Sequence, residues 1–306
     1  GAGYDLALLS RDPDRLEAAA QSARQAGVRA IAIPTDVADA DAVDRAASQA
    51  EAELGPIDVW VNVAMATVFA PVSALTADEI RRATEVTYLG QVHGVMAALR
   101  RMRPRDRGVI VCVGSALAYR SVPLQAVYCG AKFAIRGFLD SLRSELLHDR
   151  SAVRVTEVDL PAVNTPQFDW ARNKTGKKAR PVPPVFQPEV AARAILFAAR
   201  HPRRQFWVGW PSIKAIVANR FAPGLLDRLL AKSGYSGQLA SEASDPRAPG
   251  NLFVPVKGGF SAHGRFDAVA RNVSWQARAA RHSVALLATA GAAIAGLAAW
   301  RWLSRA

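Results

Sequence analysis

The stretch that most constrains the fold covers residues 109–145, VIVCVGSALAYRSVPLQAVYCGAKFAIRGFLDSLRSE. It opens with an apolar, β-branched run that ends at Gly114-Ser115, which is typical of a buried parallel strand with a serine at its carboxyl end. After a polar turn containing Pro123, apolar residues recur at helical spacing from Ala126 onward. A buried strand followed by a helix predicts an α/β chain.

Tyr128 and Lys132 lie four residues apart on this predicted helix, so both side chains project from the same face. A free phenol has a pKa of about 10, and a neighbouring cation lowers that pKa by stabilising phenolate. Ser115, at the strand end, can then hold a carbonyl oxygen while Tyr128 gives or takes the proton. The alternative is that Tyr128 and Lys132 are a boundary residue and a solvated cation, a pairing that is common by chance.

Short apolar strands alternate with amphipathic helices along the first 210 residues, which is the pattern of right-handed βαβ units in a parallel sheet. Strands are predicted at residues 4–9, 28–33, 57–61, 109–113, 153–158 and 205–209. Helices are predicted at residues 14–26, 77–102, 188–200 and 213–230, and from residue 126 onward.

The chain resembles the short-chain dehydrogenase/reductase family over residues 1–210, because that family has a serine after its fifth strand and Tyr-x-x-x-Lys on the next helix. The resemblance implies an α/β, Rossmann-type, doubly wound parallel sheet with three layers. It implies an oxidoreductase that moves a hydride between a nicotinamide and a carbonyl or alcohol carbon. In that reaction Tyr128 is the acid/base, Lys132 tunes it and holds the ribose, and Ser115 binds the substrate oxygen. The alternative is a non-catalytic, membrane-tethered binding or scaffold protein.

In this family the residue at the end of the second strand determines cofactor specificity. An acidic residue there binds the ribose of NAD, and a basic one pairs with the phosphate of NADP. Ser10-Arg11 stands at this place, so the resemblance implies NADP (NADPH). Asp36 and Val37 match the family's adenine-contacting pair. Taken alone, Arg11 is more often a solvated cation, and Asp36 can be a carboxylate near a helix N-terminus.

Two further turns match the family in part. Asn62 and Ala64 agree with its usual Asn-Asn-Ala-Gly and are expected to contact the cofactor, whereas Val63 and Met65 depart from it. After the strand at 153–158, Thr165 would meet the nicotinamide carboxamide, although it can equally start a helix.

Thr87 stands where relatives commonly have an asparagine that holds a water behind the lysine, so the proton relay is expected to differ. The helices bearing Thr87 and Tyr128 are expected, from the resemblance, to pack against a second subunit in a homo-oligomer. Family members begin with a strand and a glycine-rich turn that residues 1–3 do not match. The chain is therefore expected to begin after those elements and to bind the cofactor weakly or not at all.

The formal net charge of +13 invites a nucleic-acid interpretation. The arginines are spread along the chain, however, and their densest cluster, at residues 100–107, follows a predicted helix, so no nucleic-acid partner is expected. Cys112 and Cys129 give no disulfide framework, which favours a reducing, cytoplasmic location. The five histidines have no metal-ligand spacing, so no metal is expected.

Three regions are expected along the chain: a catalytic domain at 1–232, a flexible linker at 233–282 that is rich in Gly, Ser, Pro and Asp, and a hydrophobic helix at 283–303. The uncharged run at 283–300 is near the minimum length for a bilayer-spanning helix, so it predicts a membrane anchor or a soluble packing helix. Residues 166–188 carry aromatic residues among lysines and prolines, which suits a mobile lid over an apolar small-molecule substrate.

Overall fold

The computed structural model describes residues 2–258 and 261–281. At its centre is a four-stranded parallel sheet in the order β3-β5-β6-β9, formed by Val59–Asn62, Val109–Ser115, Arg154–Leu160 and Gln205–Trp207. β5 pairs with β6 along its whole length, from Val109 opposite Arg154 to Ser115 opposite Leu160. β5 is buried after its first residue, which explains why its sequence is a continuous apolar run rather than an alternating one.

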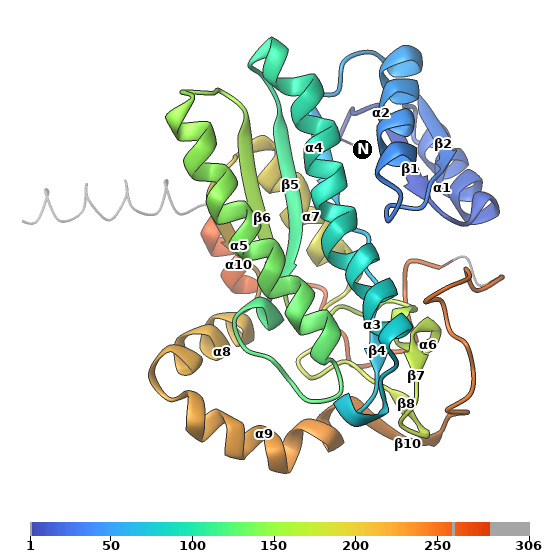
Figure 1. Ribbon diagram of the computed structural model, residues 1–306, viewed down its shortest axis with the longest axis vertical. Coiled ribbons are helices and arrows are strands. Elements are labelled where there is room, and N and C mark those ends of the chain that lie inside the picture. Colours follow the sequence, from blue (N-terminus) through green and yellow to red (C-terminus); the bar gives the residue numbers. More distant parts are fainter. Residues whose placement is uncertain (1, 259–260, 282–306) are drawn as a thin grey trace, which may run out of the picture.

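Helices cover both faces of this sheet. Figure 1 shows α4 (Gly90–Met102) and α5 (Ala126–His148) in front of β5 and β6, with α7 (Pro188–Arg200) behind them. The front core packs Ile110 and Cys112 of β5 against α4 and α5, and the rear core packs Val111 and Val158 against α7. This arrangement is the three-layer, doubly wound α/β fold that the resemblance implied.

A parallel pair of strands, β1 (Leu6–Ser10) and β2 (Ala30–Pro34), lies beside this sheet with α1 (Pro13–Gln25) and α2 (Ala40–Leu54). Both helices start at an aspartate whose side chain accepts backbone N–H groups, Asp12 for α1 and Asp39 for α2. Within the described ranges no ladder joins β1 to β3, so the pair contacts the larger sheet through side chains around Ile57.

The segment predicted as one helix at residues 77–102 is divided into three parts. These are α3 (Ala77–Thr84), a π-helical turn η2 (Glu85–Leu89) and α4. Thr87 lies in the π turn, and its hydroxyl accepts from the Ala66 N–H at 2.8 Å and donates to the Ala66 carbonyl at 2.9 Å. The wider turn thus joins the helix to the loop after β3.

The predicted lid has regular structure. It contains α6 (Gln167–Trp170), β7 (Arg172–Asn173), which pairs with β4 (Val68–Phe69), and β8 (Lys177–Ala179). Phe168 contacts Phe69 and Phe266, with ring centroids 6.2 and 5.8 Å apart. Short 3-10 turns complete the domain: η1 (Val72–Ala74), η3 (Arg103–Arg105) and η4 (Ala116–Ala118).

Residues after 210 pack on the domain. α8 (Trp210–Phe221) and α9 (Pro223–Gln238) replace the single helix predicted at 213–230, because Pro223 begins a new helix. β10 (Leu239–Ala243) pairs antiparallel with β8, Leu252 is fully buried, and α10 (Trp275–Arg281) places Ala277 in the rear core. The stretch that composition alone suggested to be a linker therefore makes specific contacts, because its few apolar side chains and its backbone carbonyls meet the domain.

The predicted hydrophobic helix at 283–303 lies outside the described residues. Among the helices that are described, none is both long and apolar enough to span a bilayer.

Candidate active site

Strand β5 and helix α5 bring the three predicted catalytic side chains to one place. Ser115 is the buried last residue of β5, and its Oγ accepts the Leu117 N–H at 3.1 Å. Tyr128 lies in the first turn of α5 and shares a hydrogen bond with Ser115. Lys132 follows one turn later, with its Nζ 5.5 Å from the centroid of the Tyr128 ring. The spacing of these residues in the sequence therefore corresponds to a shared site.

The pKa values of the two titrating groups are set mainly by burial. Burial raises the pKa of the Tyr128 hydroxyl well above its ordinary value, while the hydrogen bond from Ser115 lowers it. Burial lowers the pKa of the Lys132 ammonium to about 8, and Asp159 opposes this shift. Lys132 was expected to set the pKa of Tyr128, but burial and the Ser115 hydrogen bond are the two largest influences in this structure. Tyr128 holds its proton at neutral pH and can donate it.

Lys132 is only 2% exposed, yet its ammonium keeps hydrogen-bonding capacity. Its Nζ donates to the Val113 carbonyl at 2.6 Å, the one hydrogen bond of this group within the described part of the chain. An ammonium has three donors. Its remaining N–H groups suit the hydroxyls of a ribose, so Lys132 fits the role that the resemblance implies.

Arg11, the residue predicted to select NADP, contacts residues 251–253 near the C-terminal end of the described chain. Its guanidinium donates to the carbonyls of Asn251 and Phe253 at 2.5 and 2.9 Å, and to that of Leu252 at 3.3 Å. Ser10 is exposed, and its carbonyl accepts the Thr35 N–H at 2.8 Å.

Asp36 pairs with Arg82, a residue that the sequence analysis missed. The two side chains are 2.5 Å apart, and the Asp36 carboxylate also accepts the Ala38 N–H at 3.0 Å. Burial alone would raise the pKa of Asp36, but the bonds from Arg82 and Ala38 hold it below its ordinary value. Arg11 and Arg82 thus place two guanidinium groups near one carboxylate, a donor set that fits the adenosine end of a phosphorylated dinucleotide.

The other predicted cofactor residues have mixed surroundings. Val37 packs in the core beside Gly90, where a Cβ would lie 2.6 Å from the Val37 Cγ2. Asn62 is buried and uses its side chain internally, accepting from the Trp60 indole N–H at 2.8 Å. Ala64 is exposed in the turn that follows. Thr165 is half-buried, and the C-terminal segment approaches its carbonyl at Gly264.

Two buried acids lie behind the Ser115–Tyr128 pair, and the sequence analysis did not single them out. Glu157 and Asp159 occupy alternate positions of β6, and both are 0% exposed. The Tyr119 hydroxyl donates to Asp159 Oδ2 at 3.1 Å. Carboxylates at alternate positions of an otherwise apolar strand were the available signal, since such side chains are rarely buried without a partner.

The arginine cluster at residues 100–107 is engaged in ion pairs. Arg100 and Arg101 each lie 2.8 Å from Asp44, and Arg107 lies 3.6 Å from Asp58. Within the described ranges no group of three potential metal ligands occurs.

Comparison with known proteins gives a consistent result. The family model for short chain dehydrogenases matches residues 1–175. The uncharacterized oxidoreductase YxnA of Bacillus subtilis is 29% identical over 300 residues, which is 97% of this chain and 83% of that protein. The putative oxidoreductase SadH of Mycobacterium tuberculosis is 30% identical over 233 residues, 74% of this chain and 84% of that one.

Solved structures give the same fold. An alcohol dehydrogenase from the archaeon Thermococcus sibiricus, complexed with 5-hydroxy-NADP, has a TM-score of 0.56 and 26% identity, covering 67% of this chain and 85% of its own. A short-chain dehydrogenase from Streptomyces avermitilis has a TM-score of 0.60 at 24% identity, covering 76% of this chain and 87% of its own, and shares the fold.

The parallel three-layer sheet and these matches define an oxidoreductase with a Rossmann-type fold for a nicotinamide cofactor. Within that class, the chain belongs to the short-chain dehydrogenase/reductase family. It is an enzyme that acts on CH–OH or C=O groups, which confirms the family and the reaction class inferred from the sequence.

Proposed function

We propose that the chain is an NADP-dependent oxidoreductase that interconverts a carbonyl and an alcohol, with Tyr128 as the acid/base. The observation that carries this proposal is the meeting of Ser115, Tyr128 and Lys132 at the end of the central strand. A nicotinamide dinucleotide, when bound, supplies or accepts the hydride.

The chain's own residues perform the proton chemistry. Ser115 binds the substrate oxygen through its hydroxyl, and this contact holds the oxygen beside the phenol of Tyr128. In reduction Tyr128 gives its proton to that oxygen, and in oxidation its phenolate takes the proton back. Lys132 supplies the positive charge that stabilises the phenolate when it forms, and it holds the ribose with its free donors. The raised pKa of Tyr128 favours the donating form in the structure as it stands.

The preference for NADP rests on Arg11 and Arg82. A phosphate is a stronger acceptor for guanidinium than a backbone carbonyl, so it can replace the carbonyls that Arg11 contacts. Asp36 and Val37 would contact the adenine. Asn62 and Ala64 would contact the cofactor at the turn after β3. Thr165 would meet the carboxamide. The Thermococcus alcohol dehydrogenase, which is complexed with 5-hydroxy-NADP, supports this choice.

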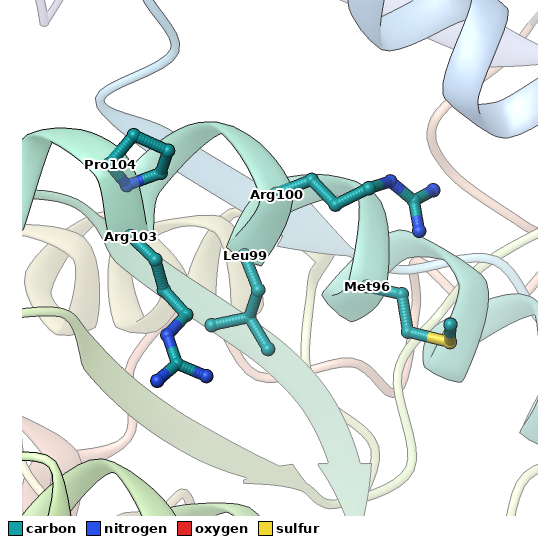
Figure 2. A pocket seen from close by; sticks show the side chains of 5 residues that line it. All are labelled: Met96, Leu99, Arg100, Arg103 and Pro104. Atoms are coloured by element: carbon teal, nitrogen blue, oxygen red, sulfur yellow. The ribbon is translucent and has the colours of Figure 1, made fainter.

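An apolar substrate and a second copy of the chain are the proposed partners. Phe168, in the segment at 166–188 that the sequence analysis placed over the substrate, contacts Phe69 and Phe266. Figure 2 shows a hollow along α4 and the turn after it, lined by Met96, Leu99, Arg100, Arg103 and Pro104. Met96 on α4 is 47% exposed and Phe133 on α5 is 41% exposed, which suits a subunit contact through these helices.

The unbonded thiols Cys112 and Cys129 favour a cytoplasmic location.

The test uses Tyr128→Phe, with Tyr235→Phe as the matched control because Tyr235 is 46% exposed on α9. Turnover of a panel of aldehydes and ketones with NADPH and NADH is expected to fall at least about 100-fold in Tyr128→Phe and to stay unchanged in the control. The change in NADPH fluorescence on mixing should be the same for the parent chain and both variants, which separates cofactor binding from turnover. Equal turnover by Tyr128→Phe and the parent chain would remove Tyr128 from the mechanism. Binding without turnover of any substrate would favour the non-catalytic alternative.

A further inference from the structure

Strand β6 carries two acidic side chains into the interior directly beneath the candidate active site. Glu157 and Asp159 alternate with Val158, so they share the face of β6 that looks toward α5, while Val158 packs in the rear core. Both are fully buried. Since a buried, ionised carboxylate without partners is costly, two such groups two residues apart require an explanation.

Gly114 provides the space in which the two carboxyl groups meet. A Cβ at this position would lie 2.3 Å from Asp159 Oδ1 and 3.0 Å from Glu157 Oε1. The two oxygens therefore surround the same point, and they are no further apart than those two distances combined. Gly114 pairs directly with Asp159 across the ladder, between Val113 and Ser115. The absence of a side chain at Gly114 leaves room for both oxygens at this point.

These two oxygens have no hydrogen-bond partner within the part of the chain that the structure describes. The other oxygens are held, since Tyr119 donates to Asp159 Oδ2 and the Gln205 amide donates to Glu157 Oε2 at 3.3 Å. Arg143 lies 3.9 Å from the same Glu157 oxygen, and the Ser115 N–H donates to the Asp159 carboxylate. A proton placed between two carboxyl groups gives one a donor and the other an acceptor. Burial and the neighbouring acid raise the pKa of Asp159, and burial raises that of Glu157, so protonation is favoured.

The acid pair lies next to the cation of the active site. Lys132 Nζ donates to the carbonyl of Val113, the residue before Gly114, so the ammonium and the acid pair adjoin the same part of strand β5. The charges of Asp159 and Glu157 both favour the protonated form of Lys132 against the effect of burial. The titratable groups that surround the pair from β5, η4 and α5 are Cys112, Tyr119, Tyr128, Lys132, Arg136 and Arg143.

We propose that Glu157 and Asp159 share a single proton, and that the one negative charge left on the pair keeps Lys132 protonated in its buried position. The inference rests on the proposed function, because it assigns the pair to the Tyr128–Lys132 site. Both acids are positioning residues: they act through Lys132 and do not touch the substrate. The retained charge faces the Lys132 ammonium, whereas Arg143, which lies 3.9 Å from Glu157, is closer to Asp140, at 2.8 Å.

The first experiment looks for the shared proton without using activity. The infrared difference spectrum between the parent chain and Asp159→Asn at pH 7 is expected to contain the C=O stretch of a protonated carboxyl group. Glu157→Gln should remove the same band, and Glu145→Gln, a matched change at an exposed carboxylate of α5, should leave it in place. Absence of the band in the parent chain would mean that both acids are ionised and would overturn the proposal.

The second experiment tests the link to Lys132. In Lys132→Met the cation is gone, so the band is expected to persist to higher pH than in the parent chain. In the parent background, the double change Glu157→Gln and Asp159→Asn removes the negative charge altogether, so it should move the alkaline limb of the pH profile of carbonyl reduction toward lower pH by roughly one unit. A band that titrates at the same pH with and without Lys132 would refute the coupling. Lack of turnover by the parent chain would count against the proposed function, while the infrared titrations would still decide the proposal.

Discussion

Leu252 packs residues 245–258 against the catalytic domain, and truncating its side chain tests this packing. The side chain is fully buried in a cluster with Val68, Ala83 and Val86. Truncating a fully buried leucine to alanine costs about 2–5 kcal/mol. If this free energy is lost from the packing of residues 245–258 on the domain, the equilibrium constant for their local unfolding rises about 30-fold or more, since each 1.4 kcal/mol is a factor of ten.

Amide hydrogen exchange measures this effect directly. In Leu252→Ala, the protected amides of residues 245–258 are expected to exchange about 30-fold faster or more, while those of β5 and β6 keep the parent rate. Phe253→Ala is the matched control, because the adjacent Phe253 is 51% exposed and its truncation removes little buried area. Unchanged exchange in Leu252→Ala, or an equal acceleration in Phe253→Ala, would refute the docking of this segment through Leu252.

Two other changes give separate tests. Gly114→Ala places a Cβ 2.3 Å from Asp159 Oδ1, so urea titration should show a loss of about 1–3 kcal/mol and turnover should fall; an unchanged urea midpoint would contradict the crowding. The pKa of His263 is raised above 6.5 by hydrogen bonds to Glu189 and Asp267. The stabilisation that the protonated His263 ring provides is therefore complete below pH 6.5, and it is lost as the pH rises through the pKa of the folded state. Exchange at residues 261–271 should accelerate over that range, and His263→Ala should abolish the dependence.

The elements of the sheet could be predicted closely because their signals are local. The apolar run at residues 109–113 and the helical spacing from Ala126 onward correspond to β5 and α5. The helix predicted at 77–102 is helical throughout, but the sequence did not indicate the π turn at its centre, which holds Thr87 against Ala66. That contact joins residues 21 positions apart, so no periodicity within the helix could indicate it.

Part of the candidate site could also be predicted from the sequence, and part of it could not. Ser115, Tyr128 and Lys132 could be predicted because two of them share a helix and the third ends the preceding strand. The acid pair could not be placed from the sequence, since its position depends on the space at Gly114 in a neighbouring strand. The surroundings of Arg11 were also beyond prediction, because the carbonyls that it contacts lie about 240 residues further along the chain.

By itself, the sequence indicated the family, the parallel α/β class and the proximity of Ser115, Tyr128 and Lys132. Each of these depends on residue types and spacings within one or two consecutive elements, where backbone geometry fixes which side chains share a face. Only the tertiary structure decided that burial controls the pKa of Tyr128, that two acids converge behind Lys132, and that Arg11 contacts the C-terminal segment. Desolvation and close approach depend on which distant segments fill the surrounding space, and that is set by the packing of the whole fold.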